Sequence, residues 1–349
     1  MVPDLNRYPY IGYDTETTGL RYPTNSAFFI GIATPDERTF SWDLRYTDEF
    51  DNLARALGDY TGRIICHNAS FDYRMTKMAG ITLNIYGLDD TVIRACAIDE
   101  HLPSYQLDYL AGRYLGKSKK IDIYQDLASI FGGSATRNTQ MKNIAKAPTS
   151  VVAPYIEHDA LLALRLWEWQ NMQLDAESSP YPGVPSLRQI MAFERGLMPR
   201  FIRMEMAGIR VDLEKAEEAR QELGKQLAIA YDELNALIGP VNINSPTQMR
   251  ELFRPEMVDG EWQVGGVIIG TTSKGAPSLR AESLRALADN GDRRAELILD
   301  TRSLIKTKDT FIEGHVLGHE VGGRVYPTIN QSKGEDGGTG TGRLSYQDP

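Results

Sequence analysis

The chain has 349 residues, of which 42% are hydrophobic and 24% are charged, so it has apolar material for the cores of about two domains. It lacks a run of 18 apolar residues and a basic start followed by an apolar stretch, which argues against a membrane span and a secretion signal. Two cysteines are too few for a disulfide framework and favour a cytoplasmic location. The net charge of −9 is unlike that of a simple nucleic-acid coat protein, but it allows a nuclease whose metal site is built of carboxylates.

Strand patterns and helical patterns alternate along the first half of the chain. Apolar and aromatic runs predict strands at residues 8–16, 26–34, 39–44 and 62–69. Apolar residues at helical spacing predict helices at residues 48–60, 71–80, 107–116 and 153–174. Because the strands come first and helices are interleaved later, we expect an α/β domain with a mixed sheet.

A stretch with three prolines, one glycine and two serines, Ala176–Pro185, indicates a domain boundary. We therefore expect a first domain at residues 1–176, a linker at 177–185 and a second domain at 186–349. Helical spacing recurs at residues 187–208, 213–239, 278–290 and 293–318, and a Ser-Pro capping pattern opens a further helix within 242–253. The last 25 residues return to strand and loop patterns, so the second domain is expected to be mostly α-helical with a short β segment.

Two carboxylates, Asp14 and Glu16, lie two residues apart at the end of the first apolar strand. Alternate residues of a strand point to the same face, so these two side chains are expected on one face. Carboxylate oxygens of this kind suit Mg²⁺ or Mn²⁺. Taken alone, an Asp-x-Glu pair is also typical of a solvated acidic loop.

Two further segments add residues of the same chemical kind. A strand delivers Asn68, and Asp72 falls in the first turns of the helix that follows. In a later helix, Tyr155 and Asp159 are four residues apart and therefore share a helix face. Apolar residues follow Asp159, which indicates a buried helix, where a carboxylate is costly unless it is paired or binds a metal.

Phosphodiester hydrolysis requires side chains of these types. Two divalent ions roughly 3.5–4 Å apart can activate a water molecule and stabilise the leaving oxygen. Holding two ions takes about four carboxylates, and a phenol beside the water can orient it. The four carboxylates and the tyrosine therefore predict a two-metal phosphodiesterase.

The three segments resemble the proofreading exonuclease domain of family A DNA polymerases, the group of bacterial DNA polymerase I. Within that group they resemble the DEDD exonucleases that have a tyrosine in the third motif. The resemblance implies a ribonuclease H-like fold, in which helices flank a mixed sheet. It also implies a metal-dependent 3′–5′ DNA exonuclease that proofreads during DNA replication, in the cytoplasm of a bacterial or phage-infected cell and associated with the nucleoid.

The resemblance assigns a role to each residue of the predicted site. Asp14 would bridge two Mg²⁺ or Mn²⁺ ions, and Glu16 and Asp159 would bind the ion that activates water. Asp72 would hold the second ion, largely through water, and Tyr155 would orient the nucleophile.

Much of the second half resembles the thumb of the same family and the edge of its palm. Such a thumb holds duplex DNA mainly through phosphate contacts. The resemblance implies DNA contacts for Arg302 and Lys306, which share a helix face, and for Arg343 in a Thr-Gly-Arg-Leu-Ser motif. Asn68 would support substrate binding at the second exonuclease motif. The alternative is that the three cations are solvated surface residues.

The palm aspartates and the fingers of this family follow the segment that the sequence covers, so we expect no polymerisation by this chain alone. The expected partners are a single-stranded DNA 3′ end, a primer–template duplex and a second chain that carries palm and fingers. One alternative is a docking subunit that mainly holds DNA within a split polymerase. Another is an RNA-trimming exonuclease, because the same chemistry accepts RNA.

Overall fold

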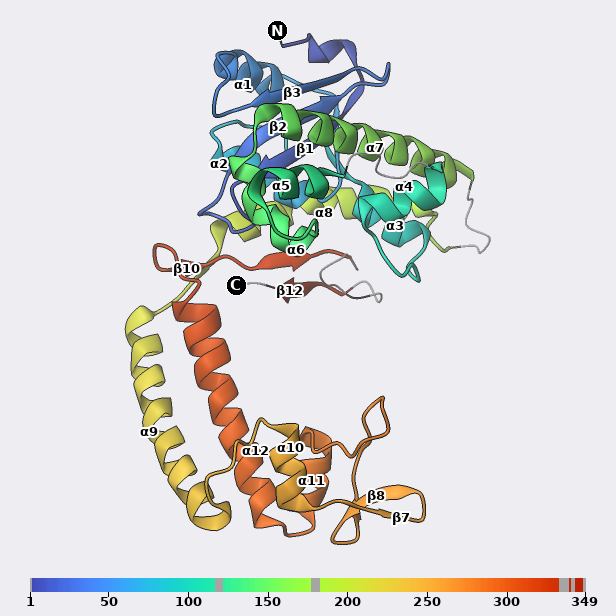
Figure 1. Cartoon of the computed structure of the whole chain (residues 1–349). Helices are drawn as coiled ribbons and strands as arrows, with labels where there is room; N and C mark the ends of the chain where they lie inside the picture. Colours follow the sequence, from blue (N-terminus) through green and yellow to red (C-terminus); the bar gives the residue numbers. More distant parts are fainter. Residues whose placement is uncertain (1, 117–121, 177–182, 333–338, 340–342, 348–349) are drawn as a thin grey trace. The chain divides into compact units, whose positions relative to one another are not determined.

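The computed structural model describes residues 2–116, 122–176, 183–332, 339 and 343–347, which form two compact units (Figure 1). Unit 1 contains Met1–Gly208 together with Tyr326–Asp348, and unit 2 contains Ile209–Val325. Among the described residues, none of the helices combines the length and the hydropathy that a membrane span requires.

Unit 1 is built on a mixed sheet, which has five strands within the described residues. The strands are β1 (Tyr10–Thr17), β2 (Ala27–Ala33), β3 (Thr39–Asp43), β4 (Arg63–Cys66) and β5 (Leu88–Asp90). They lie side by side in the order β3-β2-β1-β4-β5. The pairs β1–β2 and β2–β3 are antiparallel, whereas β1–β4 and β4–β5 are parallel. β2 is buried along its whole length, as expected of a strand covered on both faces.

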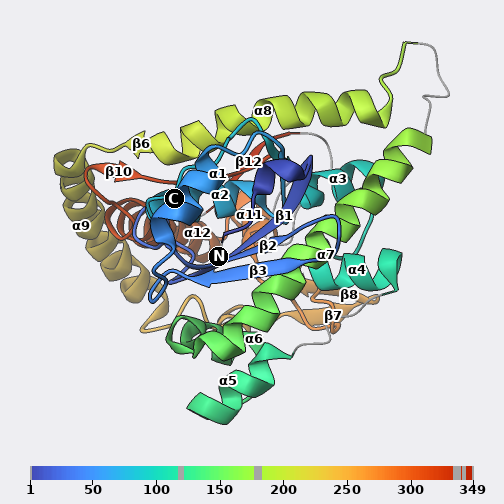
Figure 2. The ribbon, with the colours of Figure 1, turned by 90° about the horizontal axis from the view of Figure 1, so that it is seen from above.

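Two helices cover opposite faces of β1. The long helix α7 (Thr149–Ala176) runs across β1, β2 and β3 on one face (Figure 2). Helix α2 (Ala69–Met78) packs on the other face, where Tyr13 of β1 and Thr76 of α2 form a hydrogen bond of 2.7 Å. Side chains alternate along a strand, so even-numbered residues of β1 face α7 and odd-numbered residues face α2.

The remaining elements of unit 1 surround this core. Its other helices are α1 (Phe50–Gly58), α3 (Thr91–Ile98), α4 (Leu107–Leu115), α5 (Ile123–Phe131), α6 (Arg137–Gln140) and α8 (Leu187–Ala207), with 3-10 helices at Leu5–Arg7 and Met141–Lys146. Helix α8 begins with a capping box, in which the side chains of Ser186 and Gln189 each accept the other residue's backbone N–H. The strands β11 (Thr328–Asn330) and β12 (Ser345–Gln347) form an antiparallel pair.

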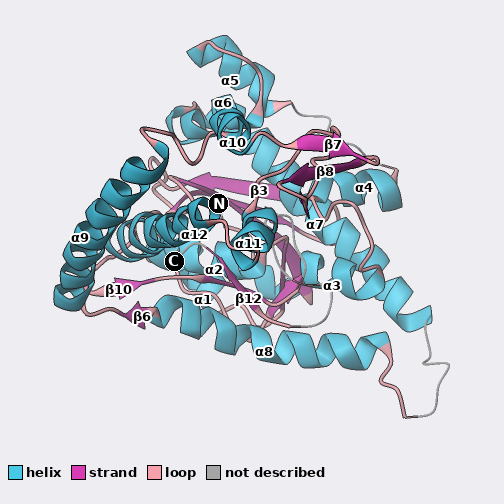
Figure 3. Ribbon diagram, turned by 90° about the horizontal axis from the view of Figure 1, so that it is seen from below, coloured by secondary structure: helices cyan, strands magenta, loops and turns pink. Residues whose placement is uncertain are grey.

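Unit 2 is mainly helical (Figure 3). Its helices are α9 (Leu213–Ile238), α10 (Pro246–Phe253), α11 (Ala281–Asp289) and α12 (Arg293–Ile305), and a π-helix, η3 (Lys306–Leu317), continues α12. Its small sheets contain β6 (Ile209–Arg210) with β10 (Arg324–Val325), and β7 (Glu256–Val258), β8 (Glu261–Val264) and β9 (Val267–Ile268). Helix α9 packs against α12 and η3. Ser245 caps α10 through the Gln248 N–H, as its sequence pattern predicts.

The predicted fold class is confirmed: a mixed sheet with helices is followed by a mainly helical region with small sheets. The elements that were not predicted include α3, α5, β5, the β7–β9 sheet and the change from α-helix to π-helix after Ile305. Most of the expected linker, residues 177–182, lies outside the described residues. The domain limits therefore remain a prediction. The compact unit that contains the five-stranded sheet also contains α8, β11 and β12.

Candidate functional site

Asp14 and Glu16 lie on the face of β1 that α7 covers. Their backbones pair with Gly31 and Phe29 of β2, and the register shifts between Glu16 and Thr17 at the end of the strand. Asp14 is half-buried and Glu16 is buried. The predicted carboxylate pair is therefore at a strand end and on a single face.

Glycines allow α7 to approach this part of the sheet closely. A Cβ atom at Gly12 would lie less than 3.0 Å from the Ala160 carbonyl oxygen, and one at Gly31 would lie 2.8 Å from the Ile156 carbonyl oxygen. Gly31 is the residue paired with Asp14. Backbone contact at these two points brings the turn of α7 between Ile156 and Ala160 directly over the strand that carries Asp14.

The same turn of α7 contains Tyr155 and Asp159, whose side chains are 6% and 7% exposed. The pKa of the Tyr155 phenol is raised well above its usual value, first by burial and then by the negative charges of Asp159, Glu16 and Asp14. Tyr155 therefore stays neutral at any working pH, and three carboxylates lie within its electrostatic reach. The structure thus brings together four of the predicted site residues.

Asp72 lies on the opposite face of β1, next to Thr15. It lies in the first turn of α2 and is 2% exposed, and its Oδ1 accepts a hydrogen bond of 2.6 Å from the Thr15 hydroxyl. Its Oδ2 is buried and has no hydrogen-bond partner among the described residues. Burial raises the pKa of Asp72 to about 8, although the hydrogen bond from Thr15 acts in the other direction.

Asp14 and Asp72 both raise the pKa values of two buried neighbours, Tyr13 and Cys66. Burial is the main cause that raises the pKa of Tyr13 and of Cys66, and the charges of both Asp72 and Asp14 raise these pKa values further. Both carboxylates therefore lie within electrostatic reach of Tyr13 and Cys66. Cys66 is a buried thiol with a raised pKa, which is typical of an unreactive core cysteine.

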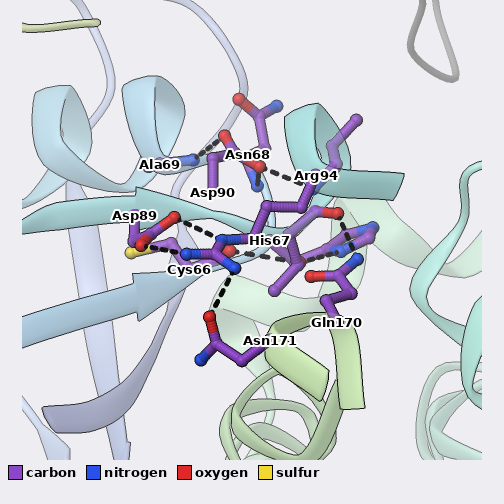
Figure 4. Close-up of polar contacts among 11 residues, drawn as sticks. Cys66, His67, Asn68, Ala69, Asp89, Asp90, Arg94, Gln170 and Asn171 are labelled. Atoms are coloured by element: carbon purple, nitrogen blue, oxygen red, sulfur yellow. Dashed lines mark hydrogen bonds and ion pairs between the residues drawn. The ribbon is translucent and has the colours of Figure 1, made fainter. Parts of the chain in front are cut away.

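A polar network holds the start of α2 (Figure 4). Asn68 has a left-handed backbone (φ 88°) immediately before the helix. The Asp90 carboxylate accepts backbone N–H groups from Asn68 at 3.3 Å, from Ala69 at 2.7 Å and from Val92 at 2.8 Å. Asp90 thus fixes the first residues of both α2 and α3. The sequence contained one signal for it, because an aspartate before a helical run is typical of an N-cap.

A second acidic residue of β5, Asp89, connects the strand to α3 and α7 through Arg94 (Figure 4). Asp89 accepts two hydrogen bonds of 2.7 Å from the Arg94 guanidinium, which also donates to Asn171 Oδ1 at 2.9 Å. Both ionic side chains are almost fully buried. This fork-like contact joins β5, α3 and α7, the helix that also carries Tyr155.

The donor chemistry of the site suits a hard divalent cation. Carboxylates are the preferred ligands of Mg²⁺ and Mn²⁺, and the buried Asp72 Oδ2 atom lacks a hydrogen-bond partner among the described residues. Within that part of the chain, no three His, Cys, Asp or Glu side chains come together as a metal-binding group. The fit of metal ions therefore rests on the ligand types and on that unsatisfied oxygen.

The three cations expected to contact DNA have different surroundings. Arg302 is half-buried in unit 2, and its guanidinium donates hydrogen bonds to the carbonyl oxygens of Leu279 and Ile243. Lys306 is exposed, with its ammonium 5.6 Å from the ring centre of Phe311. Arg343 is exposed at the end of unit 1, whereas the Thr and Gly before it lie outside the described residues.

Comparison with family models divides the chain into two matched regions. Residues 1–174 match a 3′–5′ exonuclease model. Residues 213–349 match the model of DNA polymerase family A. The first match contains Asp14, Glu16, Asp72, Tyr155 and Asp159, and the second contains most of unit 2.

Curated relatives match nearly the whole chain. DNA polymerase DpoZ of Vibrio phage phiVC8 is 45% identical over 99% of this chain and 55% of its own length. DNA polymerase DpoZ of Acinetobacter phage SH-Ab 15497 is 41% identical, with 99% and 56% covered. DNA polymerase I of Chloroflexus aurantiacus is 27% identical, with 100% and 35% covered. The chain thus spans about half the length of the phage relatives.

A solved structure shares the fold. The POL domain of Pol1 from M. smegmatis, in complex with DNA primer-template and dNTP, aligns with a TM-score of 0.72 and 21% identity. The alignment covers 99% of this chain and 53% of that structure. The two family models and the phage relatives show that the chain belongs to the family A DNA polymerases. It comprises a 3′–5′ exonuclease domain and part of a polymerase domain.

Proposed function

We propose that this chain removes nucleotides from a DNA 3′ end by metal-dependent hydrolysis, as the proofreading exonuclease of a DNA polymerase. The observation that carries the proposal is the contact of α7 with β1 at Gly12 and with β2 at Gly31, with Tyr155 of α7 within electrostatic reach of Asp14, Glu16 and Asp159. The match of residues 1–174 to a 3′–5′ exonuclease model supports the same reaction.

Four carboxylates would hold two Mg²⁺ or Mn²⁺ ions: Asp14, Glu16, Asp72 and Asp159. When bound, the ions would supply an activated water and stabilisation of the leaving oxygen. Tyr155 contributes a neutral phenol that can accept a hydrogen bond from the attacking water and orient it. Thr15 holds the Asp72 carboxyl so that its second oxygen stays available for binding.

The proposed substrate is a single-stranded or frayed DNA 3′ end. Its support comes from the curated relatives, which are DNA polymerases, and from the related structure, which is a complex with a DNA primer-template. The exposed cations Lys306 and Arg343 are suited to phosphate contacts that hold DNA without reading its sequence. Arg302 already donates to two backbone carbonyls, so its contribution to DNA binding is proposed to be smaller.

A primer-shortening assay tests the proposal. The wild-type chain is expected to shorten a 5′-labelled DNA primer by single nucleotides from its 3′ end, and to stop when a chelator removes divalent ions. Asp14→Ala and Asp159→Ala should each lower the rate by more than the roughly 100-fold typical of residues that only support metal ligands. Full activity in both variants would refute the ligand assignment.

The same assay decides between DNA and RNA. An RNA primer of identical sequence should be shortened more slowly than the DNA primer if the chain proofreads DNA. Faster shortening of RNA would instead support the RNA-trimming alternative.

A further inference from the structure

Glu205 is a buried carboxylate of α8 that contacts two other elements of unit 1. Its side chain is fully shielded from solvent. Its Oε1 accepts the backbone N–H of Ile329 in β11 at 2.7 Å, and its Oε2 accepts the hydroxyl of Ser70 in α2. Arg74 of α2 lies 3.5 Å from Oε2. A buried charge of this kind is costly, and a buried ion pair is often no more stabilising than apolar residues of the same volume.

Two of the partners of Glu205, Ser70 and Arg74, belong to α2, the helix that carries Asp72. Ser70 and Arg74 are four residues apart and therefore lie on one face of α2. Asp72 lies between them in the sequence and is held from β1 by Thr15. Helix α2 is thus fixed at two places, by the sheet through Asp72 and by Glu205 through the flanking residues.

A second contact connects the same helix to the end of β1 and to the start of β11. The Arg74 guanidinium lies 5.9 Å from the ring centre of Tyr22, which is in the loop after β1. Tyr22 in turn meets Tyr326 in an edge-on arrangement, with ring centres 5.4 Å apart. Arg74 therefore contacts both the loop after β1 and, through Tyr22, the residue two positions before β11.

We propose that Arg74 and Glu205 are positioning residues of the exonuclease, which hold α2 against β11 so that Asp72 stays in place to bind a divalent ion. Strand β11 lies in the region that matches the polymerase model, so part of that region is a structural element of the exonuclease site. This inference rests on the proposed function, because it assumes that Asp72 is a metal ligand.

The decisive variant is Arg74→Met/Glu205→Met, which removes both charges and keeps the side-chain volumes. Mn²⁺ binding to the full chain, measured by electron paramagnetic resonance without DNA, should weaken by about 10-fold or more. In the primer-shortening assay, kcat should fall by about 10-fold or more while KM for DNA stays within about 2-fold, since substrate contacts are retained. Glu205→Gln keeps hydrogen-bonding groups for Ile329 and Ser70 and should retain more Mn²⁺ affinity than the double variant.

Two controls separate positioning from general damage. Arg200→Met alters an exposed arginine of α8 whose side chain donates to the Gly196 carbonyl, and it should bind Mn²⁺ as the wild type does. Tyr326→Phe keeps the ring that meets Tyr22 and should match the wild type, whereas Tyr326→Ala should weaken Mn²⁺ binding.

Asp72→Asn distinguishes failure of this inference from failure of the proposed function. If Asp72→Asn lowers Mn²⁺ affinity while Arg74→Met/Glu205→Met leaves it unchanged, the positioning role is wrong and the metal site stands. If Asp72→Asn itself leaves affinity and activity unchanged, the proposed ligand is wrong and the inference falls with it. Should the double variant not fold, Tyr326→Ala decides: wild-type Mn²⁺ affinity in that variant overturns the positioning role.

Discussion

The carboxyl group of Asp72 is buried, and its pKa is raised to about 8 by that burial. In the unfolded chain an aspartate has a pKa of about 3.9. Between these two values the folded state keeps a proton that the unfolded state has released. The contribution of Asp72 to the free energy of unfolding of the metal-free protein therefore falls as the pH rises from about 4 to about 8.

Replacing Asp72 by asparagine should consequently stabilise the metal-free protein at pH 8. The introduced amide would retain an oxygen for the Thr15 hydroxyl but would carry no charge. In chelator, the melting temperature of the variant should exceed that of the wild type by at least about 2 °C, and the difference should vanish near pH 4. Thermal unfolding followed by circular dichroism measures this, and a variant that melts below the wild type at pH 8 would contradict the assigned protonation.

The hydroxyl of Tyr155 is expected to act in catalysis and not in folding. Tyr155→Phe removes one oxygen from a ring that stays buried, so kcat should fall by about 100-fold while KM for DNA changes little. Single-turnover shortening of a DNA primer measures the loss. Tyr114→Phe is the matched control, because Tyr114 stacks on Trp169 through its ring and should keep full activity. Equal rates in both variants would remove Tyr155 from the mechanism.

At the scale of elements, the proposed site depends on the close packing of α7 against the sheet. Gly12→Ala would place a Cβ atom less than 3.0 Å from the Ala160 carbonyl, which cannot move without the helix. Overpacking of this kind typically costs about 1–3 kcal/mol. Urea unfolding should detect the loss of stability, and the primer-shortening rate should fall because Asp159 moves with α7.

Gly196→Ala provides the control for that substitution. A Cβ atom at Gly196 of α8 would have no neighbour within 4 Å, and alanine favours a helix over glycine by roughly 1 kcal/mol. The variant should be as stable as the wild type or more stable, with unchanged activity. Normal stability and activity in Gly12→Ala would mean that α7 does not rest on β1 at this point.

Local patterns predicted the parts of the site that lie within single elements. Strand alternation predicted Asp14 and Glu16 on one face of the strand, and the four-residue spacing predicted Tyr155 and Asp159 on one face of the helix. The hydrogen bond from Thr15 to Asp72 was not predictable, because it joins a residue of β1 to a residue of α2 that lies 57 positions away in the sequence. The role of the glycines under α7 was also not predictable, since only the packed structure shows which backbone they meet.

The limits of prediction among the elements have similar causes. Strand β5 has three residues and carries little pattern of its own, although it pairs with β4 throughout. The periodicity of residues 293–318 predicted one helix, but none of the residues of the π-helix Lys306–Leu317 is buried, so its apolar spacing carries little information on the backbone bonding. The sequence did not single out Glu205, because its partners lie in α2 and β11.

At the scale of the whole molecule, the two compact units should respond differently to metal ions. The proposed ligands all lie in unit 1, so saturating Mn²⁺ should raise the melting temperature of that unit and leave that of unit 2 unchanged. At 100 times the dissociation constant, the added stability would be about 2.7 kcal/mol. Differential scanning calorimetry measures both transitions. An equal shift of both would place the metal-binding residues elsewhere.

The two-metal site is tested most directly by a crystal of the chain that is soaked in Mn²⁺ and studied by anomalous scattering. We expect two peaks roughly 3.5–4 Å apart at the end of β1, both next to Asp14, with Asp159 at one and Asp72 at the other. The Asp14→Asn variant should lose both peaks. Peaks remote from β1, or unchanged peaks in Asp14→Asn, would contradict the proposed two-metal exonuclease site.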